Sequence, residues 1–152
     1  MQIESLFTVL KKFNITSRQD FFSEAFSRNF GLLTKKEQQK LADAKIAIPG
    51  MGGVGGVHLI TLARSGIGKF NLADFDTFEP ANINRQFGAR VPDLGRPKLE
   101  VMAEHARCVN PYLELNLFEE GLNEQNLDLF LDGVDVVLDG LDFFTFDLRR
   151  KL

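Results

Sequence analysis

The sequence predicts an α/β fold, in which a doubly wound, mostly parallel sheet follows a helical N-terminal extension. Two observations support this fold class. From Lys45 onward, short apolar runs typical of strands alternate with amphipathic runs typical of helices. A chain of 152 residues with 44% hydrophobic content is also long enough to bury one core. Right-handed crossovers between parallel strands would place helices on both faces of the sheet.

Residues 1–44 are predicted to form the helical extension, with two short helices. Ser17 and Asp20 have the spacing of a capping box, and Thr34 and Glu37 repeat that spacing.

Phenylalanines are concentrated in this extension. Phe22, Phe26 and Phe30 would share one face of a helix, provided that the helix continues that far. Such a face either packs on the core of the same chain or docks onto another subunit, and the sequence leaves both readings open.

Residues 45–152 are predicted to form a second unit, built as βαβαβαβ. The expected strands are 45–49, 69–74, 112–118 and 134–138, and the expected helices are 53–66, 96–108 and 123–131. Gly66 is placed to end the first of these helices as a C-cap glycine. Residues 141–152 resemble the opening of one more helix, so we expect a sheet truncated at its C-terminal end and a chain that is a fragment.

The join after the first strand reads Gly50-Met51-Gly52-Gly53-Val54-Gly55, a G-x-G-x-x-G turn. In such a turn Gly50 allows the tight bend, Gly52 and Gly53 let backbone N–H groups approach a diphosphate, and Gly55 permits close helix packing. Asp74 ends the next strand at about the ~20-residue offset of a ribose-binding carboxylate. Together these features indicate a Rossmann-like nucleotide-binding domain over residues 45–152.

Composition excludes several classes of function. A net charge of −3 gives no basic field for nucleic acid, so no such partner is expected. Cys108 is the only cysteine, which rules out a disulfide framework within the chain and a zinc site built from paired cysteines. We expect Cys108 to be packed and unreactive at the edge of its helix. No run has the length of a membrane span, and a cytoplasmic location is expected.

The carboxyl ends of parallel strands meet at one edge of a sheet. We therefore expect Asp74, Asp76, Asp139 and Asp142 to face the same crevice as the glycine turn.

The segment 74–87, Asp-Phe-Asp-Thr-Phe-Glu-Pro-Ala-Asn-Ile-Asn-Arg-Gln-Phe, resembles the D-x-D-x-V-x-x-x-N-x-x-R-Q signature of the ThiF/MoeB/ubiquitin-activating superfamily. Residues 95–98 resemble its G-x-x-K, and 136–142 resemble its D-x-x-D-N at the fourth strand. The resemblance spans about residues 26–152. It implies an adenylyltransferase that binds Mg·ATP and transfers AMP to a carboxylate, most typically the C-terminus of a ubiquitin-like or sulfur-carrier protein.

The resemblance also implies residue roles. Arg85 and Lys98 would contact the phosphates at the solvent-facing edge of the crevice, and a guanidinium fork beside a point charge suits a moving phosphoryl group. Asn82 would orient a phosphate oxygen, Gln86 would support that loop, and Asp74 would bind the ribose.

Three further residues complete the implied site. Asp142 would hold Mg²⁺, and Asp139 could share that role. Arg28 would reach the ATP of a neighbouring subunit as an arginine finger, within a homodimer or heterodimer.

Two departures keep other functions open. Leu141 and Phe143 stand where the family carries polar residues beside the metal. They motivate a catalytically silent partner subunit of a heterodimeric activating enzyme as the alternative. An NAD- or FAD-dependent oxidoreductase would share the glycine turn but would leave Asn82, Arg85 and Lys98 without a role.

Overall fold

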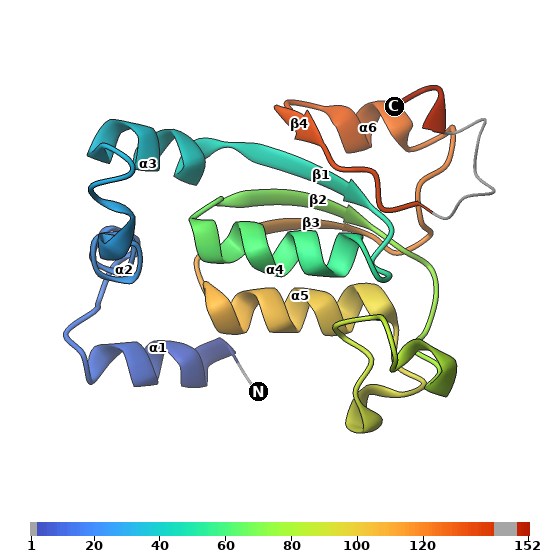
Figure 1. Cartoon of the computed structure of the whole chain (residues 1–152), viewed down its shortest axis with the longest axis horizontal. Coiled ribbons are helices and arrows are strands. Elements are labelled where there is room, and N and C mark those ends of the chain that lie inside the picture. Colours follow the sequence, from blue (N-terminus) through green and yellow to red (C-terminus); the bar gives the residue numbers. More distant parts are fainter. Residues whose placement is uncertain (1–2, 142–148) are drawn as a thin grey trace.

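The structure, a computed structural model, describes residues 3–141 and 149–152. Within them lies a sheet of four strands in the order β3-β2-β1-β4, with parallel pairing at every join (Figure 1). The strands are β1 Lys45–Pro49, β2 Lys69–Ala73, β3 Glu114–Phe118 and β4 Val136–Val137. The predicted α/β fold with a parallel sheet is confirmed.

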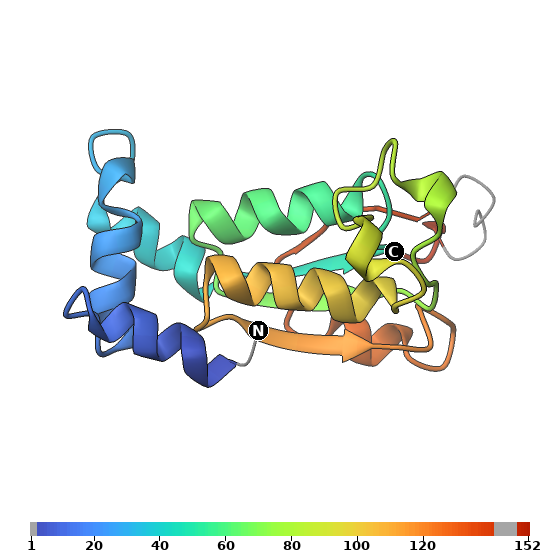
Figure 2. The same ribbon diagram turned by 90° about the horizontal axis from the view of Figure 1, so that it is seen from below.

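Helices cover both faces of this sheet, as right-handed crossovers require. The helices α4 (Gly55–Ser65) and α5 (Lys98–Val109) lie side by side on one face, and α6 (Leu127–Leu131) lies on the other (Figures 1 and 2). Side-chain alternation in β1 serves both layers, because Ile48 packs into the larger core under α4 and α5 while Ala47 packs against Phe130 of α6.

The strand register places the two joins that matter for function next to each other. Pro49, the last residue of β1, pairs with Ala73, the last residue of β2. The N–H of Gly50 then donates to the carbonyl of Ala73 at 2.7 Å. The glycine turn and Asp74 therefore leave the sheet side by side at its carboxyl edge.

The N-terminal extension contains three α-helices, not the two that the sequence predicted. They are α1 Ile3–Lys11, α2 Arg18–Ala25 and α3 Lys35–Asp43. Both predicted capping boxes are present, with side chain and backbone bonded reciprocally at Ser17 and Asp20 and at Thr34 and Glu37. These boxes fix where α2 and α3 begin.

The expected continuous face of Phe22, Phe26 and Phe30 does not form, because α2 ends at Ala25 and a 3₁₀ turn, η1 (Ser27–Asn29), follows. Phe26 is instead buried, and its ring lies 5.0 Å from that of Phe22. Phe30 lies beyond the turn and is exposed.

Most predicted elements of the second unit are present, and the last helix is shorter than expected. Within 123–131 only Leu127–Leu131 is α-helical. The side chains of Asn123 and Asn126 accept backbone N–H groups of the preceding turn, and such local bonds compete with a helix. The helix expected over 141–152 falls largely outside the described residues.

Cys108 is exposed, which corrects the expectation of a packed thiol. Among the described residues, no helix is both long and apolar enough to cross a membrane.

Candidate functional site

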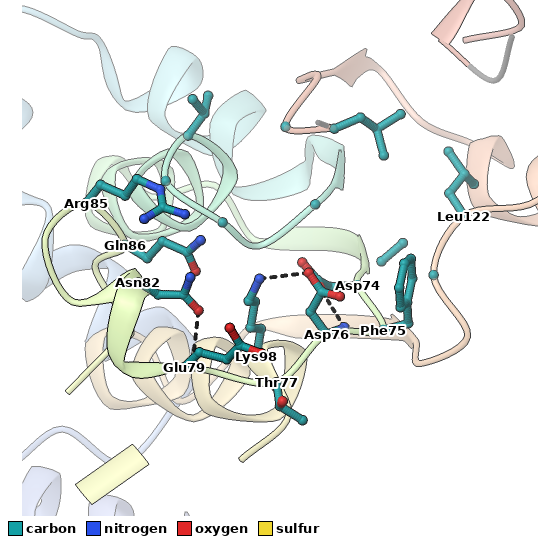
Figure 3. A pocket seen from close by; sticks show the side chains of 18 residues that line it. Asp74, Phe75, Asp76, Thr77, Glu79, Asn82, Arg85, Gln86, Lys98 and Leu122 are labelled. Carbon is teal, nitrogen blue, oxygen red and sulfur yellow. Dashed lines mark hydrogen bonds and ion pairs between the residues drawn. The ribbon is translucent and has the colours of Figure 1, made fainter. Parts of the chain in front are cut away.

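A cavity of about 620 Å³ lies at the carboxyl edge of the sheet. The loops that follow β1, β2 and β3 and the segment after β4 all contribute to its wall. Eight of the residues predicted for the site line this cavity: Gly50, Gly52, Gly53, Asp74, Asn82, Arg85, Gln86 and Lys98. Figure 3 shows Arg85, Gln86 and Asn82 on one side, Asp74 and Asp76 on the other, and Lys98 between them.

The glycines of the turn differ in what surrounds them. Gly50 has a φ of +89°, and a Cβ there would lie 2.3 Å from the carbonyl oxygen of Gly140. A Cβ on Gly55 would lie 1.8 Å from the carbonyl oxygen of Gly50, so this buried glycine packs the turn against α4 and does not line the cavity. Gly52 has room, because its nearest neighbour would be Nε2 of Gln86 at 3.6 Å.

Asp74 ties the glycine turn to the loop that follows β2. Its Oδ2 accepts a hydrogen bond from the N–H of Met51 at 2.6 Å, and its Oδ1 accepts one from the N–H of Asp76 at 2.8 Å. Burial raises the pKa of Asp74 above its ordinary value, although both hydrogen bonds oppose that shift. Each carboxylate oxygen keeps a further lone pair, so the group can still accept hydrogen bonds from hydroxyl groups.

Lys98, the first residue of α5, is buried, which corrects the expectation that it lies at a solvent-facing edge. Its Nζ lies 2.8 Å from Oδ2 of Asp76. Its backbone N–H also donates to the carbonyl of Asp76 at 2.8 Å. The only described ion pair of this lysine is therefore with a carboxylate of the same cavity.

The loop after β2 carries the other polar side chains of the cavity. Arg85 is exposed, as expected, and its Nη1 donates to the carbonyl of Ala81 at 2.6 Å. Oδ1 of Asn82 accepts the N–H of Glu79 at 2.9 Å, which fixes the orientation of that amide. Oε1 of Gln86 is buried and has no hydrogen-bond partner among the described residues. Its amide lies against Gly52, and both residues line the cavity.

Sequence reasoning missed an apolar end of the cavity. Phe75 and Leu122 line the cavity there, beside Gly121, which has a φ of +72°. A Cβ on Gly121 would lie 2.6 Å from Cδ1 of Phe75, so the ring packs directly on this glycine. The topology could have predicted this wall. The carboxyl end of β3 lies at the same edge of the sheet as those of β1 and β2, so the segment that follows β3 borders the same cavity.

The predicted metal ligands are not assembled among the described residues. Asp139 forms an ion pair with Arg149 and accepts a second hydrogen bond from the N–H of Leu141 at 3.0 Å. Asp142 lies outside the described residues. Over 3–141 and 149–152, no three histidine, cysteine or acidic side chains are grouped as a metal site. The expectation of a Mg²⁺ site therefore rests on Asp139 and on Asp142, which the structure does not describe.

Arg28 lies far from the cavity of its own chain. It is exposed on η1, and the neighbouring Asn29 contacts the carbonyl of Ser65 at the C-terminal end of α4. The cavity lies at the opposite, N-terminal end of α4, because Gly53 and Val54 line it and α4 begins at Gly55.

A parallel α/β sheet with a glycine turn and basic side chains at its carboxyl edge defines a nucleotide-binding type of domain. Residues 26–152 match the sequence profile of the ThiF family, and the chain belongs to that family.

Two curated relatives illustrate the range of the family. The chain is 35% identical over 129 residues to the tRNA threonylcarbamoyladenosine dehydratase of Haemophilus influenzae, which covers 84% of this chain and 49% of the relative. It is also 35% identical over 105 residues to the sulfur carrier protein ThiS adenylyltransferase of Escherichia coli, covering 69% and 42% of the two chains. The chain thus spans about half the length of these relatives.

Solved structures agree with the fold. The E. coli tRNA N6-threonylcarbamoyladenosine dehydratase TcdA superposes with a TM-score of 0.77 at 35% identity, over 81% of this chain and 52% of that one. The complex of TcdA with ATP superposes with a TM-score of 0.75 at 32% identity, over 86% and 57%.

Proposed function

We propose that this chain is the nucleotide-binding part of an ATP-dependent adenylyltransferase that transfers AMP to a carboxylate. One observation carries the proposal: Arg85 and Lys98 line the same cavity as the glycine turn, although they come from different segments of the chain. A bare dinucleotide-binding domain has no need of these two cations. The ATP complex of TcdA supports the choice of ATP over a nicotinamide or flavin cofactor.

The chemistry follows from the charges around the cavity. A carboxylate oxygen of the acceptor attacks the α-phosphorus of ATP, the bond to the diphosphate breaks, and negative charge builds on the phosphoryl oxygens and the leaving group. Lys98 meets this charge as a point cation, and Arg85 meets it with its guanidinium fork. Because Lys98 is buried, its attraction to the phosphates is less screened by water than that of a surface lysine.

Other residues of the cavity bind and orient the nucleotide. Backbone N–H groups of the glycine turn face the phosphates, as at a helix N-terminus. Asp74 accepts the ribose hydroxyls, Asn82 orients a phosphate oxygen, and Gln86 supports the loop. A bound Mg²⁺ would neutralise phosphate charge, and Asp142 and Asp139 are its expected ligands.

The acceptor is proposed to be the C-terminus of a ubiquitin-like or sulfur-carrier protein, because a relative named as a ThiS adenylyltransferase is 35% identical. A carboxylate carried on tRNA is the second candidate, and the similarity to tRNA threonylcarbamoyladenosine dehydratases favours it. The net charge of −3 does not favour RNA as an electrostatic partner.

We also propose a dimer in which Arg28 acts on the neighbouring subunit's nucleotide, since it cannot reach the cavity of its own chain. Exposed large apolar side chains at the N-terminal end of α4 and on the segment that follows β2 support a covered surface: Val54, Val57, Ile83, Phe87 and Val91. A catalytically silent subunit in a heterodimer remains the alternative function. The cytoplasm is the proposed location.

The exchange of diphosphate into ATP tests the proposal. It is measured with the whole wild-type protein and with its Lys98→Gln variant, each in the presence of a carrier-protein acceptor and then of a tRNA acceptor. We expect acceptor-dependent exchange in wild type and its loss in the variant. ATP binding without exchange would favour the silent subunit. Binding of NADH without binding of ATP would refute the proposal.

A further inference from the structure

Asp76 lies at the junction of the contacts that assemble the cavity. Its backbone N–H donates to Asp74 at 2.8 Å, and its backbone carbonyl accepts from the N–H of Lys98 at 2.8 Å. Its carboxylate accepts a hydrogen bond from Nζ of Lys98, also at 2.8 Å. Asp76 thus joins the carboxylate expected at the ribose to the cation expected at the phosphates (Figure 3).

The two members of the Asp76–Lys98 ion pair differ sharply in exposure. The side chain of Lys98 is 8% exposed, whereas that of Asp76 is 46% exposed. A buried ammonium without a counterion is costly, so Lys98 needs an anion at all times. A half-exposed carboxylate can return to water at small cost. The pair is therefore built so that the lysine stays in place while its anion can be replaced.

We propose that Asp76 is a positioning residue that holds Lys98 in the empty cavity and releases it to the phosphates of the incoming nucleotide. This inference rests on the proposed function, because it takes a nucleoside triphosphate as the replacing anion. Before binding, Asp76 keeps the ammonium aimed into the cavity. On binding, one anionic partner of Lys98 is exchanged for another, and the freed carboxylate turns to solvent.

The exchange makes Asp76 a competitor of ATP. Removing its charge while keeping its shape, in Asp76→Asn, leaves Lys98 with a weaker neutral partner. ATP should then bind tighter, by about five- to tenfold, since no ion pair has to be broken. A purely structural role for Asp76 predicts the opposite result, because loosening the loop would weaken binding.

The test is isothermal titration of wild type and Asp76→Asn with ATP and with adenosine. Adenosine carries no phosphate, so its affinity should be the same for both proteins. Glu79→Gln is the matched control, because Glu79 is an exposed carboxylate of the same cavity that forms no described ion pair with Lys98. We expect this control to change ATP affinity less than twofold.

A double-mutant cycle with Lys98→Gln assigns the effect to the lysine. In that background Asp76→Asn should shift ATP affinity no more than Glu79→Gln does. Diphosphate exchange should show a lower KM for ATP and a lower kcat in Asp76→Asn, because the ammonium is no longer aimed before binding. Asp76→Glu, which keeps the charge, should stay within about twofold of wild type and provides a second variant if the amide does not fold.

Unchanged or weaker ATP binding by folded Asp76→Asn would overturn the inference while leaving the proposed function intact. A gain that persists without Lys98, or that appears equally with adenosine, would also overturn it. A wild-type protein that binds no ATP would overturn both the inference and the proposed function.

Discussion

Two glycines of the same turn should respond to alanine in opposite ways. Gly55→Ala places a methyl group 1.8 Å from the carbonyl oxygen of Gly50 and 3.1 Å from Cγ2 of Ile48. Gly52→Ala places one no nearer than 3.6 Å to any atom outside its immediate neighbours, the closest being in the side chain of Gln86. The first change therefore meets backbone, and the second meets only the edge of the cavity.

The size of the effect follows from how far the backbone must move. Contacts of a real Cβ are essentially never under 3.0 Å, so the Gly50 carbonyl would have to retreat by about 1.2 Å, the difference between 3.0 and 1.8 Å. It is held where it is, because the Gly50 N–H bonds to Ala73 at 2.7 Å. Overpacking of this kind costs about 3 kcal/mol. For a chain of this size that corresponds to a loss of about 6–12 °C in Tm.

Thermal unfolding followed by circular dichroism, together with ATP titration, separates the two variants. Gly55→Ala should lower Tm by that amount. Gly52→Ala should leave Tm within about 2 °C of wild type but weaken ATP, since the methyl group stands where phosphate oxygens would approach the backbone. A Gly55→Ala protein as stable as wild type would refute the packing argument, and unchanged ATP affinity in Gly52→Ala would remove that glycine from the proposed phosphate contact.

Three further outcomes are expected. Arg85→Ala should reduce diphosphate exchange by roughly 100-fold, because the cation proposed at the phosphates is lost. Its Tm should stay within about 1 °C of wild type, because the side chain is exposed. Asn71→Ala should cost about 2 kcal/mol in urea unfolding, since it leaves a buried carbonyl of α6 without its donor. Burial alone would raise the pKa of Asp93, but hydrogen bonds from Arg90 and Arg96 together with the positive charge of Arg90 outweigh it and lower that pKa. The stability that Asp93 provides is therefore present above its ordinary pKa and lost as pH falls through the lowered one, so acid titration should abolish the roughly 2 kcal/mol cost of Asp93→Asn seen at neutral pH.

Local signals in the sequence predicted the elements whose ends they fix. Gly66 ends α4 in the left-handed conformation, with a φ of +97°, as its position after an amphipathic run predicted. The capping boxes at Ser17 and Thr34 act within four residues, so they need no knowledge of the rest of the fold. The alternation of strand and helix similarly leaves few arrangements once right-handed crossovers are imposed.

The burial of individual side chains could not be predicted from the sequence as directly as the ends of these elements. Leu99, Met102 and Ala106 form a buried stripe on α5, but Cys108 lies off that stripe and is exposed, contrary to the expectation of a packed thiol. The expectation for Lys98 was wrong in the opposite direction, because this residue was expected to face solvent and is buried. A lysine that follows Pro97 in a polar segment reads as solvated, and its burial depends on Asp76, 22 residues earlier in the chain. Contacts between residues so far apart in the chain come from tertiary structure and produce no periodic pattern in the sequence.

Contacts within the chain hold the walls of the cavity together, with one exception. Asp74 fixes the turn through the N–H of Met51 and fixes the following loop through the N–H of Asp76, so both walls are set before any nucleotide arrives. Preorganised walls reduce the cost of ordering the site on binding. The Lys98–Asp76 ion pair is the exception, because we propose that it opens when a phosphate replaces Asp76 at the ammonium. Discrimination between triphosphate and nucleoside should therefore depend on this pair as well as on the backbone N–H groups of the glycine turn, because adenosine carries no phosphate to replace Asp76 or to accept from the turn.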